Sequence, residues 1–404
     1  MRIVLLNQFY PPDLAPTGVM LESVAKQLVA NGHDVTILCA SNAYAGHHVP
    51  LPISPEADAI TINRIRVPSI GGRSAIGKLL SYLCYCLGLA WSLLWQKADL
   101  VVMMTTPPYL SVIGRLFTKF RGARIAHWVM DLYPDVMTAY GMIPQGGYRD
   151  RILRSIARWG FGGRRSRLIL TLGPDMAARV SRLTGPQNQP CEWIPLWGTV
   201  PGHAEQRRIE ELRRERNWGQ GETIFVYSGN MGLGHRFAEF IEAARSLSPD
   251  CGIRLAYFGN GGRKKEIAAL LADWRDGPHS IDGYVDAACL AAHLQTADVH
   301  LASLEPAWDG TMLPSKLQGI FAAGRPVIFT GSKTGSMGQW ILESGAGWVC
   351  EPGDIEAHRQ AILEAMDPEV RRRRGAAALE YSNQHFNRDK NVQRIAALLE
   401  KCVQ

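Results

Sequence analysis

Short apolar runs alternate with amphipathic stretches along the whole chain. The apolar runs are rich in Val, Ile, Leu and aromatic residues, and the stretches between them repeat apolar positions with helical spacing. This alternation predicts parallel β-α-β units, because two parallel strands must be joined by a crossover helix. The strand-like runs form two series, at 1–8, 33–40, 99–105, 123–130 and 166–173, and at 223–230, 253–260, 279–284, 298–304 and 325–331.

The two series predict two domains of similar size. A chain of 404 residues exceeds the roughly 250–300 residues at which one hydrophobic core stops growing. Pro195, Pro201 and Gly202 punctuate the stretch between the series, which places the boundary near residue 200. We therefore expect an α/β protein of two doubly wound Rossmann-like domains, 1–200 and 201–404. Ligands should bind in a cleft at the carboxyl ends of both sheets.

Composition places the chain among globular proteins of a reducing compartment. Hydrophobic residues make up 46% and charged residues 20%, which excludes a largely disordered chain. The eight cysteines form no C-x-x-C pair, so we expect reduced thiols rather than a zinc or redox site. The N-terminal MRIVLLNQFYPP lacks a small-residue cleavage site and is interpreted as a first strand. We expect a cytoplasmic protein.

Positive charge is concentrated in the first half of the chain. Residues 1–200 hold 20 Lys plus Arg against 11 Asp plus Glu, whereas the remainder holds 24 against 26, which together give the net charge of +7. A basic half suits an anionic surface, and phospholipid is favoured over nucleic acid because no zinc-finger or RNA-recognition motif accompanies the charge. A solvated basic face without a partner is the alternative.

The most hydrophobic stretch is 79–95, about 17 residues without a charge and with a lysine on each side. That length lies at the lower edge of what spans a bilayer, and the strand-like run that follows at once argues against a spanning helix. Two interpretations remain. Tyr82, Tyr85, Trp91 and Trp95 suit shallow insertion into the lipid interface, whereas a core helix under the first sheet would bury the same residues.

Residues 310–329 are interpreted as a segment that binds an anion. Pro314 sets up a turn, Lys316 supplies a cation at the start of a helix, and Gly324 ends that helix before an apolar run. Unpaired N–H groups at a helix N-terminus and a nearby ammonium group both attract a diphosphate. An ordinary helix that is stopped by glycine and followed by a buried strand is the competing interpretation.

PSK followed by a helix and AAGRPVI resembles the donor-site segment of the family 4 glycosyltransferases, in particular the branch that builds bacterial exopolysaccharides such as colanic acid. The resemblance extends over nearly the whole chain and implies the GT-B architecture. It implies that the first domain binds the acceptor, that the second binds a nucleotide-sugar, and that helix 388–401 crosses back to the first domain. The donor contacts that it implies in this segment are Pro314, Ser315, Lys316 and Leu317.

In the first domain, the resemblance implies two further sites. Gly18 belongs to the loop after the first strand, which in the family cradles a phosphate or the acceptor, although Thr17 replaces the first glycine of the usual pair. Asp131 and Asp135 follow the strand-like run at 123–130, where a carboxylate can orient or deprotonate an acceptor hydroxyl. Helix capping is the alternative role for these carboxylates.

In the second domain, the turn after 223–230 resembles the turn where the family binds the donor diphosphate with an Arg and a Lys. Counted from Gly229, those places hold Asn230 and His235, and only the neighbouring Arg236 is a permanent cation. This departure makes Lys316 the expected phosphate contact. A solvated Arg236 without a ligand is the alternative.

The paired glutamates that many relatives carry near the donor sugar are absent, because their positions fall at Thr311 and Gly319. Glu305 and Asp309 are the nearest acidic residues and become the candidates for contacting the donor sugar or acting electrostatically. The remaining donor contacts implied by the resemblance lie in FGNGG and DGYV, and are Gly259, Asn260 and Tyr284.

The resemblance implies a glycosyltransferase that retains the anomeric configuration and uses a nucleotide-sugar, a UDP-sugar in preference to a GDP-sugar, as a substrate without a cofactor. We expect no metal site, because the chain lacks D-x-D, H-x-x-x-H and clustered cysteines. The expected acceptor is a polyprenyl-diphosphate-linked saccharide, reached by peripheral contact with the inner face of the cell membrane. A nucleotide-sugar epimerase and a non-catalytic sugar-nucleotide-binding subunit are the alternatives.

Overall fold

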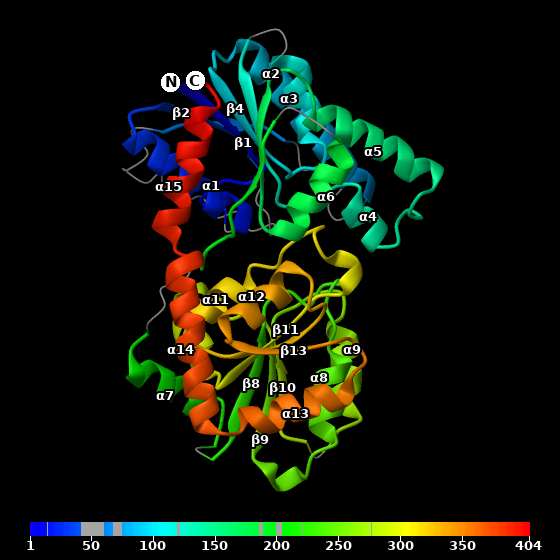
Figure 1. The fold of residues 1–404 in the computed structure, drawn as a ribbon, viewed down its shortest axis with the longest axis vertical. Helices are drawn as coiled ribbons and strands as arrows, with labels where there is room; N and C mark the ends of the chain where they lie inside the picture. Colours follow the sequence, from blue (N-terminus) through cyan, green and yellow to red (C-terminus); the bar gives the residue numbers. More distant parts are fainter. Residues whose placement is uncertain are drawn as a thin grey trace. The chain divides into compact units, whose positions relative to one another are not determined.

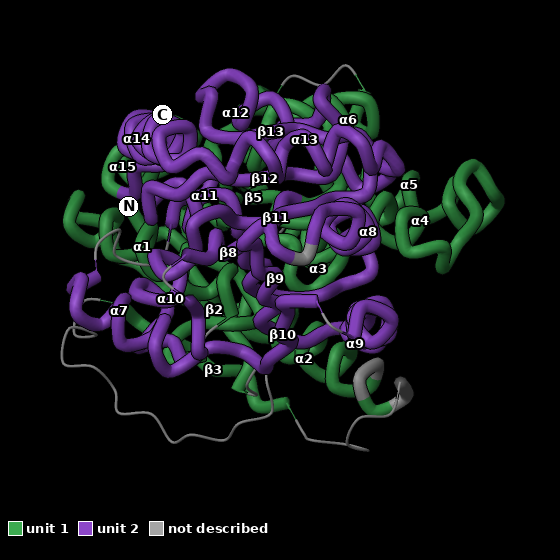
Figure 2. The backbone as a smooth tube through the Cα atoms, turned by 90° about the horizontal axis from the view of Figure 1, so that it is seen from below, with its two compact units in different colours: residues 1–195, 310–312, 389–404 green, residues 196–309, 313–388 purple. Residues whose placement is uncertain are grey.

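A computed structural model describes residues 1–13, 15–41, 60–67, 75–118, 122–185, 189–198, 204–219, 221–275 and 277–404 (Figure 1). The chain forms two compact units (Figure 2). Unit 1 contains residues 1–195, 310–312 and 389–404, and unit 2 contains residues 196–309 and 313–388. The division falls between Pro195 and Leu196. Pro201 and Gly202, which the sequence places at the boundary, lie outside the described residues.

Unit 1 is built on a seven-stranded parallel sheet with the order β3-β2-β1-β4-β5-β6-β7. Its strands are β1 Arg2–Leu6, β2 Asp34–Ala40, β3 Ile60–Ile65, β4 Leu100–Met104, β5 Arg124–Trp128, β6 Ser166–Thr171 and β7 Cys191–Trp193. The predicted parallel α/β sheet is confirmed. The sequence pattern missed the edge strands β3 and β7, because β3 buries only its two terminal residues and β7 has three residues.

The helices of unit 1 are α1 Pro16–Ala30, α2 Ala75–Trp95, α3 Leu110–Thr118, α4 Asp135–Ala139, α5 Tyr148–Phe161, α6 Pro174–Thr184 and α15 Arg388–Lys401, whose residues from Asp389 onward belong to this unit. The last helix, α15, lies beside α1 in Figure 1. There the Glu400 carboxylate accepts a hydrogen bond from Asn31 at 2.7 Å and lies 2.9 Å from His33. The chain therefore ends on unit 1.

Unit 2 is built on a six-stranded parallel sheet with the order β10-β9-β8-β11-β12-β13. Its strands are β8 Thr223–Ser228, β9 Ile253–Phe258, β10 His279–Asp282, β11 Val299–Ser303, β12 Val327–Thr330 and β13 Gly347–Cys350. Its helices are α7 Gln206–Glu215, α8 Ala238–Arg245, α9 Lys264–Ala272, α10 Leu290–Thr296, α11 Lys316–Ala322, α12 Ser336–Ser344, α13 Ile355–Ala365 and α14 Pro368–His385, with single 3-10 turns at Pro249–Cys251, Ala287–Cys289 and Pro306–Trp308. Both units reverse strand order beside their first strand, which is the doubly wound topology predicted from the sequence.

Helix α2 contains the hydrophobic stretch 79–95 and has two different faces. Tyr85 and Leu89 are fully buried in the core of unit 1, so the core-helix interpretation is correct for this face. Trp91 and Trp95 on the opposite face are 64% and 67% exposed. Within the described residues, no helix combines the length and the hydropathy needed to cross a bilayer.

Candidate functional site

The loop between β1 and α1 is shaped by its own backbone packing. A Cβ atom on Gly18 would lie 3.0 Å from the carbonyl oxygen of Phe9. The missing side chain therefore lets α1 approach the loop closely. Asn7 holds the same loop by donating to the Phe9 carbonyl at 2.7 Å. Helix α1 starts at Pro16 because proline at the first helical position needs no donor N–H. A glycine at position 18 is thus explained without a ligand.

Asp131 lies just beyond the carboxyl end of β5. The backbone N–H groups of Met130 and Asp131 both donate to the Thr105 hydroxyl at 3.0 Å, and Asp131 forms an isolated bridge with Met312, which also belongs to unit 1. Burial raises the pKa of the Asp131 carboxyl to about 6. A carboxylate with a pKa near neutrality, placed at a sheet's carboxyl edge, has the properties of a general base.

Asp135 stands in a different environment, although it is only four residues away. Its buried carboxylate lies 3.1 Å from Arg154 and 3.3 Å from Arg179, and Arg154 also pairs with Asp150 at 2.9 Å. The two arginines neutralise this carboxylate, which would be costly to bury unpaired. The structure therefore places Asp135 in an ion-pair cluster at the start of α4.

His127 lies on β5, four residues before Asp131. Its side chain is buried against Phe161, and neither ring nitrogen has a hydrogen-bond partner in the described part of the chain. Burial lowers the pKa of His127 to about 3, so the ring is neutral at physiological pH. We assign it to the core.

In unit 2, Lys316 lies over the turn that follows β8. Its ammonium nitrogen hydrogen-bonds the Tyr227 hydroxyl, donates to the Asn230 carbonyl at 3.0 Å, and lies 3.2 Å from Nε2 of His235. It also lies 4.4 Å from the centre of the Tyr227 ring, in cation-π geometry. Burial lowers the pKa of Lys316 to about 7. The fold thus brings together a lysine and a turn that are far apart in the sequence.

The hydrogen bonds of His235 determine its tautomer. Nδ1 lies 2.6 Å from the Ser303 carbonyl oxygen, which can only accept, so Nδ1 carries the proton and Nε2 accepts from Lys316. Burial, followed by the nearby Lys316 charge, lowers the pKa of His235 to about 3. His235 is therefore a neutral acceptor that positions the lysine.

Two glycine turns pack against each other beside this cluster. Gly229 has φ of +129°, and a Cβ atom there would lie 2.6 Å from Cε of Lys316. Gly259 has φ of +137°, and its Cβ would lie 1.9 Å from the Gly229 carbonyl oxygen. Backbone bonds complete the contact, since Met231 N donates to the Asn260 carbonyl at 2.8 Å. Both glycines are required by backbone geometry.

Asn260 and Tyr284 lie at the same edge of the sheet. The Tyr284 hydroxyl donates to the Asn260 carbonyl at 3.2 Å, and its side chain is largely exposed. An exposed aromatic ring next to the paired glycine turns is a suitable surface for stacking a base.

Arg236 and Glu305, proposed as separate donor contacts, form one ion pair. The Arg236 guanidinium binds both Glu305 carboxylate oxygens, at 2.8 and 3.0 Å, and also contacts Glu239 at 2.6 Å. A guanidinium that already holds two carboxylates has little capacity for a phosphate. Its contribution to the turn is structural.

The remaining candidates surround the start of α11. Pro314 is buried, Ser315 is exposed at the N-cap without a side-chain capping bond, and the Leu317 side chain is fully buried in the core. Asp309 carboxylate oxygens lie 2.7 and 2.9 Å from where a Cβ on Gly335 would stand, next to the N-terminus of α12. A carboxylate there offsets the helix dipole.

Two residues beside the Gly229 and Gly259 turns were not predicted. The Tyr227 ring contacts the Lys316 ammonium group. The Lys264 side chain donates to the carbonyls of Gly259 and Asp282 at 3.2 and 3.0 Å. Tyr227 lies in β8, and the alternation of side chains along that strand could have placed it on the core face. Its contact with Lys316, 89 residues later in the chain, could not be predicted in this way. Within the described residues, no group of three or more His, Cys, Asp or Glu could hold a metal ion.

Sequence comparisons match both units to glycosyltransferases. The family described as "Glycosyl transferase 4-like domain" matches residues 17–197, and the family "Glycosyl transferases group 1" matches residues 222–367. WcaI of Escherichia coli (strain K12), described as a colanic acid biosynthesis glycosyl transferase, is 25% identical over 385 residues, which cover 91% of this chain and 92% of that protein.

Solved structures give the same fold. Sucrose-phosphate synthase from Thermosynechococcus elongatus superposes with a TM-score of 0.78 at 15% identity, covering 99% of this chain and 98% of that one. HepE from Anabaena, solved with UDP and glucose, gives a TM-score of 0.74 at 13% identity, with coverage of 99% and 100%. The two family matches and the two doubly wound units show that the chain belongs to the family 4 glycosyltransferases of the GT-B fold.

Proposed function

We propose that this glycosyltransferase moves a sugar, with retention of configuration, from a UDP-sugar to a polyprenyl-diphosphate-linked saccharide during exopolysaccharide synthesis. The observation that carries the proposal is the position of Lys316, held over the Gly229 turn by Tyr227, Asn230 and His235. A cation beside a glycine turn, whose backbone can approach a ligand closely, is a suitable diphosphate site.

The lysine also suits the chemistry of the reaction. Sugar transfer leaves negative charge on the departing diphosphate, and a fixed ammonium group stabilises that charge without a metal ion. Tyr284, exposed beside Asn260, is our candidate for contacting the base. The choice of UDP is supported by HepE, which shares the fold and was solved with UDP-glucose.

On the acceptor side, we assign the general-base role to Asp131 rather than Asp135. Asp131 combines a raised pKa with a position at the carboxyl edge of its sheet, whereas Asp135 neutralises two arginines. The carboxylate would orient the acceptor hydroxyl and take its proton as the acceptor oxygen bonds to the anomeric carbon on the face from which the diphosphate departs, which retains the configuration.

The donor assignment is tested by a thermal-shift panel of UDP-, GDP- and dTDP-sugars. A ligand at 100 times its dissociation constant stabilises a protein by about 2.7 kcal/mol. We expect the UDP-sugars to raise the melting temperature of the wild type and of Lys265→Ala, an exposed lysine of the same unit, but not of Lys316→Ala. Unchanged UDP-sugar binding by Lys316→Ala would refute the proposal.

Turnover separates the alternatives. A transferase consumes donor only when the lipid-linked acceptor is present, an epimerase converts the donor alone, and a binding subunit does neither. The anomeric configuration of the product, read by NMR coupling constants, tests retention. We place the enzyme at the inner face of the membrane, because a polyprenyl-linked acceptor resides there and the first 200 residues carry a surplus of basic residues.

A further inference from the structure

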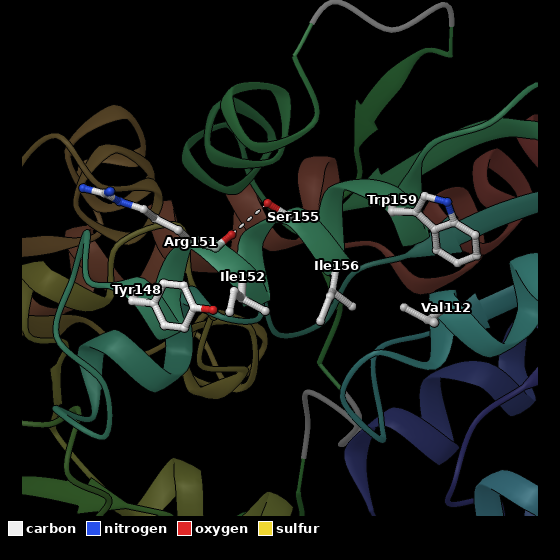
Figure 3. Close-up of a pocket in the computed structure, with 7 residues that line it drawn as sticks. All are labelled: Val112, Tyr148, Arg151, Ile152, Ser155, Ile156 and Trp159. Carbon is white, nitrogen blue, oxygen red and sulfur yellow. Dashed lines mark hydrogen bonds between the residues drawn. The ribbon is translucent and has the colours of Figure 1, made fainter.

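Helix α5 presents its large apolar side chains to solvent. Tyr148, Ile152, Ile156 and Trp159 are 79%, 41%, 39% and 42% exposed, and their spacing of three or four residues puts them on one stripe. With Val112 of α3 they line a shallow groove of about 710 Å³ (Figure 3). The stripe lies opposite the buried side of the helix.

The side that α5 buries is made of two small residues, one large apolar residue and a paired carboxylate, namely Ala157, Gly160, Phe161 and Asp150. Ala157 and Gly160 face inward, and a Cβ on Gly160 would lie 2.5 Å from the Ser111 hydroxyl of α3. Asp150, the one acidic residue of α5, is also buried and pairs with Arg154. Phe161 and the small residues therefore attach this helix to the unit, and Arg115 of α3 adds a contact to the Trp159 ring at 4.3 Å from its centre.

Arginines flank the stripe on both sides. Arg149 lies on one side, and Arg151 and Arg158 lie on the other, all exposed. Because Asp150 is buried, the charged side chains on the exposed surface of α5 are all arginines. An apolar stripe between rows of arginine is the pattern of a helix that lies in a membrane interface.

Helix α2 carries a second stripe in the same helix layer. Leu83, Leu87, Trp91 and Trp95 are 46%, 72%, 64% and 67% exposed, and the two indole rings contact each other at 5.7 Å. Helix α3 lies between α2 and α5, contacting both, along one side of unit 1 (Figure 2). Its Leu116, 46% exposed, adds to the apolar surface between them.

We propose that the outward faces of α2 and α5 form one surface that binds an anionic phospholipid bilayer, with the apolar stripes inserted and the flanking arginines at the headgroups. The proposal deepens the proposed membrane location of the enzyme. A bilayer is favoured over a protein partner because the stripe of α5 lies open between exposed arginines, and α2 adds a second open stripe of aromatic and aliphatic residues. The uniform positive charge around the α5 stripe complements the anionic headgroups of such a bilayer.

Vesicle co-sedimentation of the full chain tests the proposal without any donor or acceptor. We expect the wild type to bind phosphatidylglycerol-phosphatidylethanolamine vesicles, to bind phosphatidylcholine vesicles weakly, and to lose affinity at high salt. Ile152→Gln/Ile156→Gln and Leu87→Gln/Trp91→Gln should each weaken binding by roughly tenfold or more. Arg151→Gln/Arg158→Gln should weaken it about fivefold per arginine on anionic vesicles only.

The matched control is Leu342→Gln/Leu363→Gln, which removes two exposed leucines of unit 2 that are 53% and 37% exposed. It should bind as the wild type does. Thermal unfolding and the UDP-sugar shift of every variant should stay unchanged, so a failure of vesicle binding is distinguishable from a failure of the donor assignment.

Three results would overturn the proposal. The first is wild-type binding that ignores lipid charge. The second is full binding by the Ile152→Gln/Ile156→Gln variant, which would exclude α5 from the surface. The third is a wild-type dimer in light scattering that this variant dissociates, together with no vesicle binding, which would identify the surface as an interface between copies of the chain.

Discussion

The lowered pKa of Lys316 predicts that the affinity for the donor depends on pH. Burial lowers its pKa to about 7 in the ligand-free protein, so the neutral amine dominates above that pH. A bound diphosphate favours the ammonium form, and binding must then take up a proton. The affinity for a UDP-sugar should therefore be highest below pH 7 and should fall as the pH rises.

The magnitude follows from proton linkage. Above pH 7 the affinity should fall roughly tenfold per pH unit, which amounts to roughly a hundredfold between pH 6 and pH 9, with uptake of about 0.9 proton at pH 8. Neighbouring groups do not share this titration. The pKa of His235 is lowered to about 3, and that of Tyr227 is raised well above its ordinary value.

Isothermal titration calorimetry in buffers of different ionisation enthalpy counts the protons directly. The matched variant is Lys316→Arg, which keeps a cation that does not titrate in this range. Its donor affinity should be independent of pH between 6 and 9. A flat wild-type profile, or an equal slope in Lys316→Arg, would refute the assignment of the titration to this lysine.

Three further predictions concern single residues. Asp131→Asn should lower turnover by roughly 10²- to 10⁴-fold at saturating donor, and the wild-type rate should rise with pH through about 6, the pKa of this carboxyl. A rate that is already pH-independent from pH 5 would contradict a base at this position. Gly259→Ala should lower the free energy of urea unfolding by at least about 2 kcal/mol, because the new Cβ would lie 1.9 Å from a backbone oxygen. The control Gly262→Ala should unfold as the wild type does, because the nearest atom to its new Cβ lies at 3.4 Å. His127→Leu should stabilise unit 1 by about 1 kcal/mol, since it removes two buried unpaired nitrogens; a clear loss of stability would indicate a polar role for the ring.

Much of the architecture was predictable because it depends on local pattern. Buried parallel strands are continuous apolar runs, so the central strands of both sheets stand out in the sequence. The edge strand β3 does not, because its four inner residues are exposed or half-buried and three of them are polar. Lys316 was offered as a phosphate contact by PSK at the start of a helix together with the family resemblance, and this role stays a prediction.

The pairings of charged side chains were not predictable in this way. Arg236 and Glu305 are 69 residues apart, and Asp135 and Arg179 are 44 apart, so only the folded sheets bring them into contact. The sequence therefore offered Arg236, Glu305 and Asp135 as free site residues, whereas each is held by an oppositely charged partner in the structure.

The sequence by itself determined the strand-helix alternation, since it depends on short-range periodicity, whereas the fold assigned residues 310–312 and 389–404 to unit 1. The tertiary structure alone decided which apolar helix faces turn outward. On α5, a stripe at helical spacing would ordinarily face the core, but Gly160 packs closely on Ser111 of α3 and Phe161 is buried on the inward side, so the opposite side carries the stripe. That choice depends on contacts between separate helices, which periodicity along one helix cannot encode.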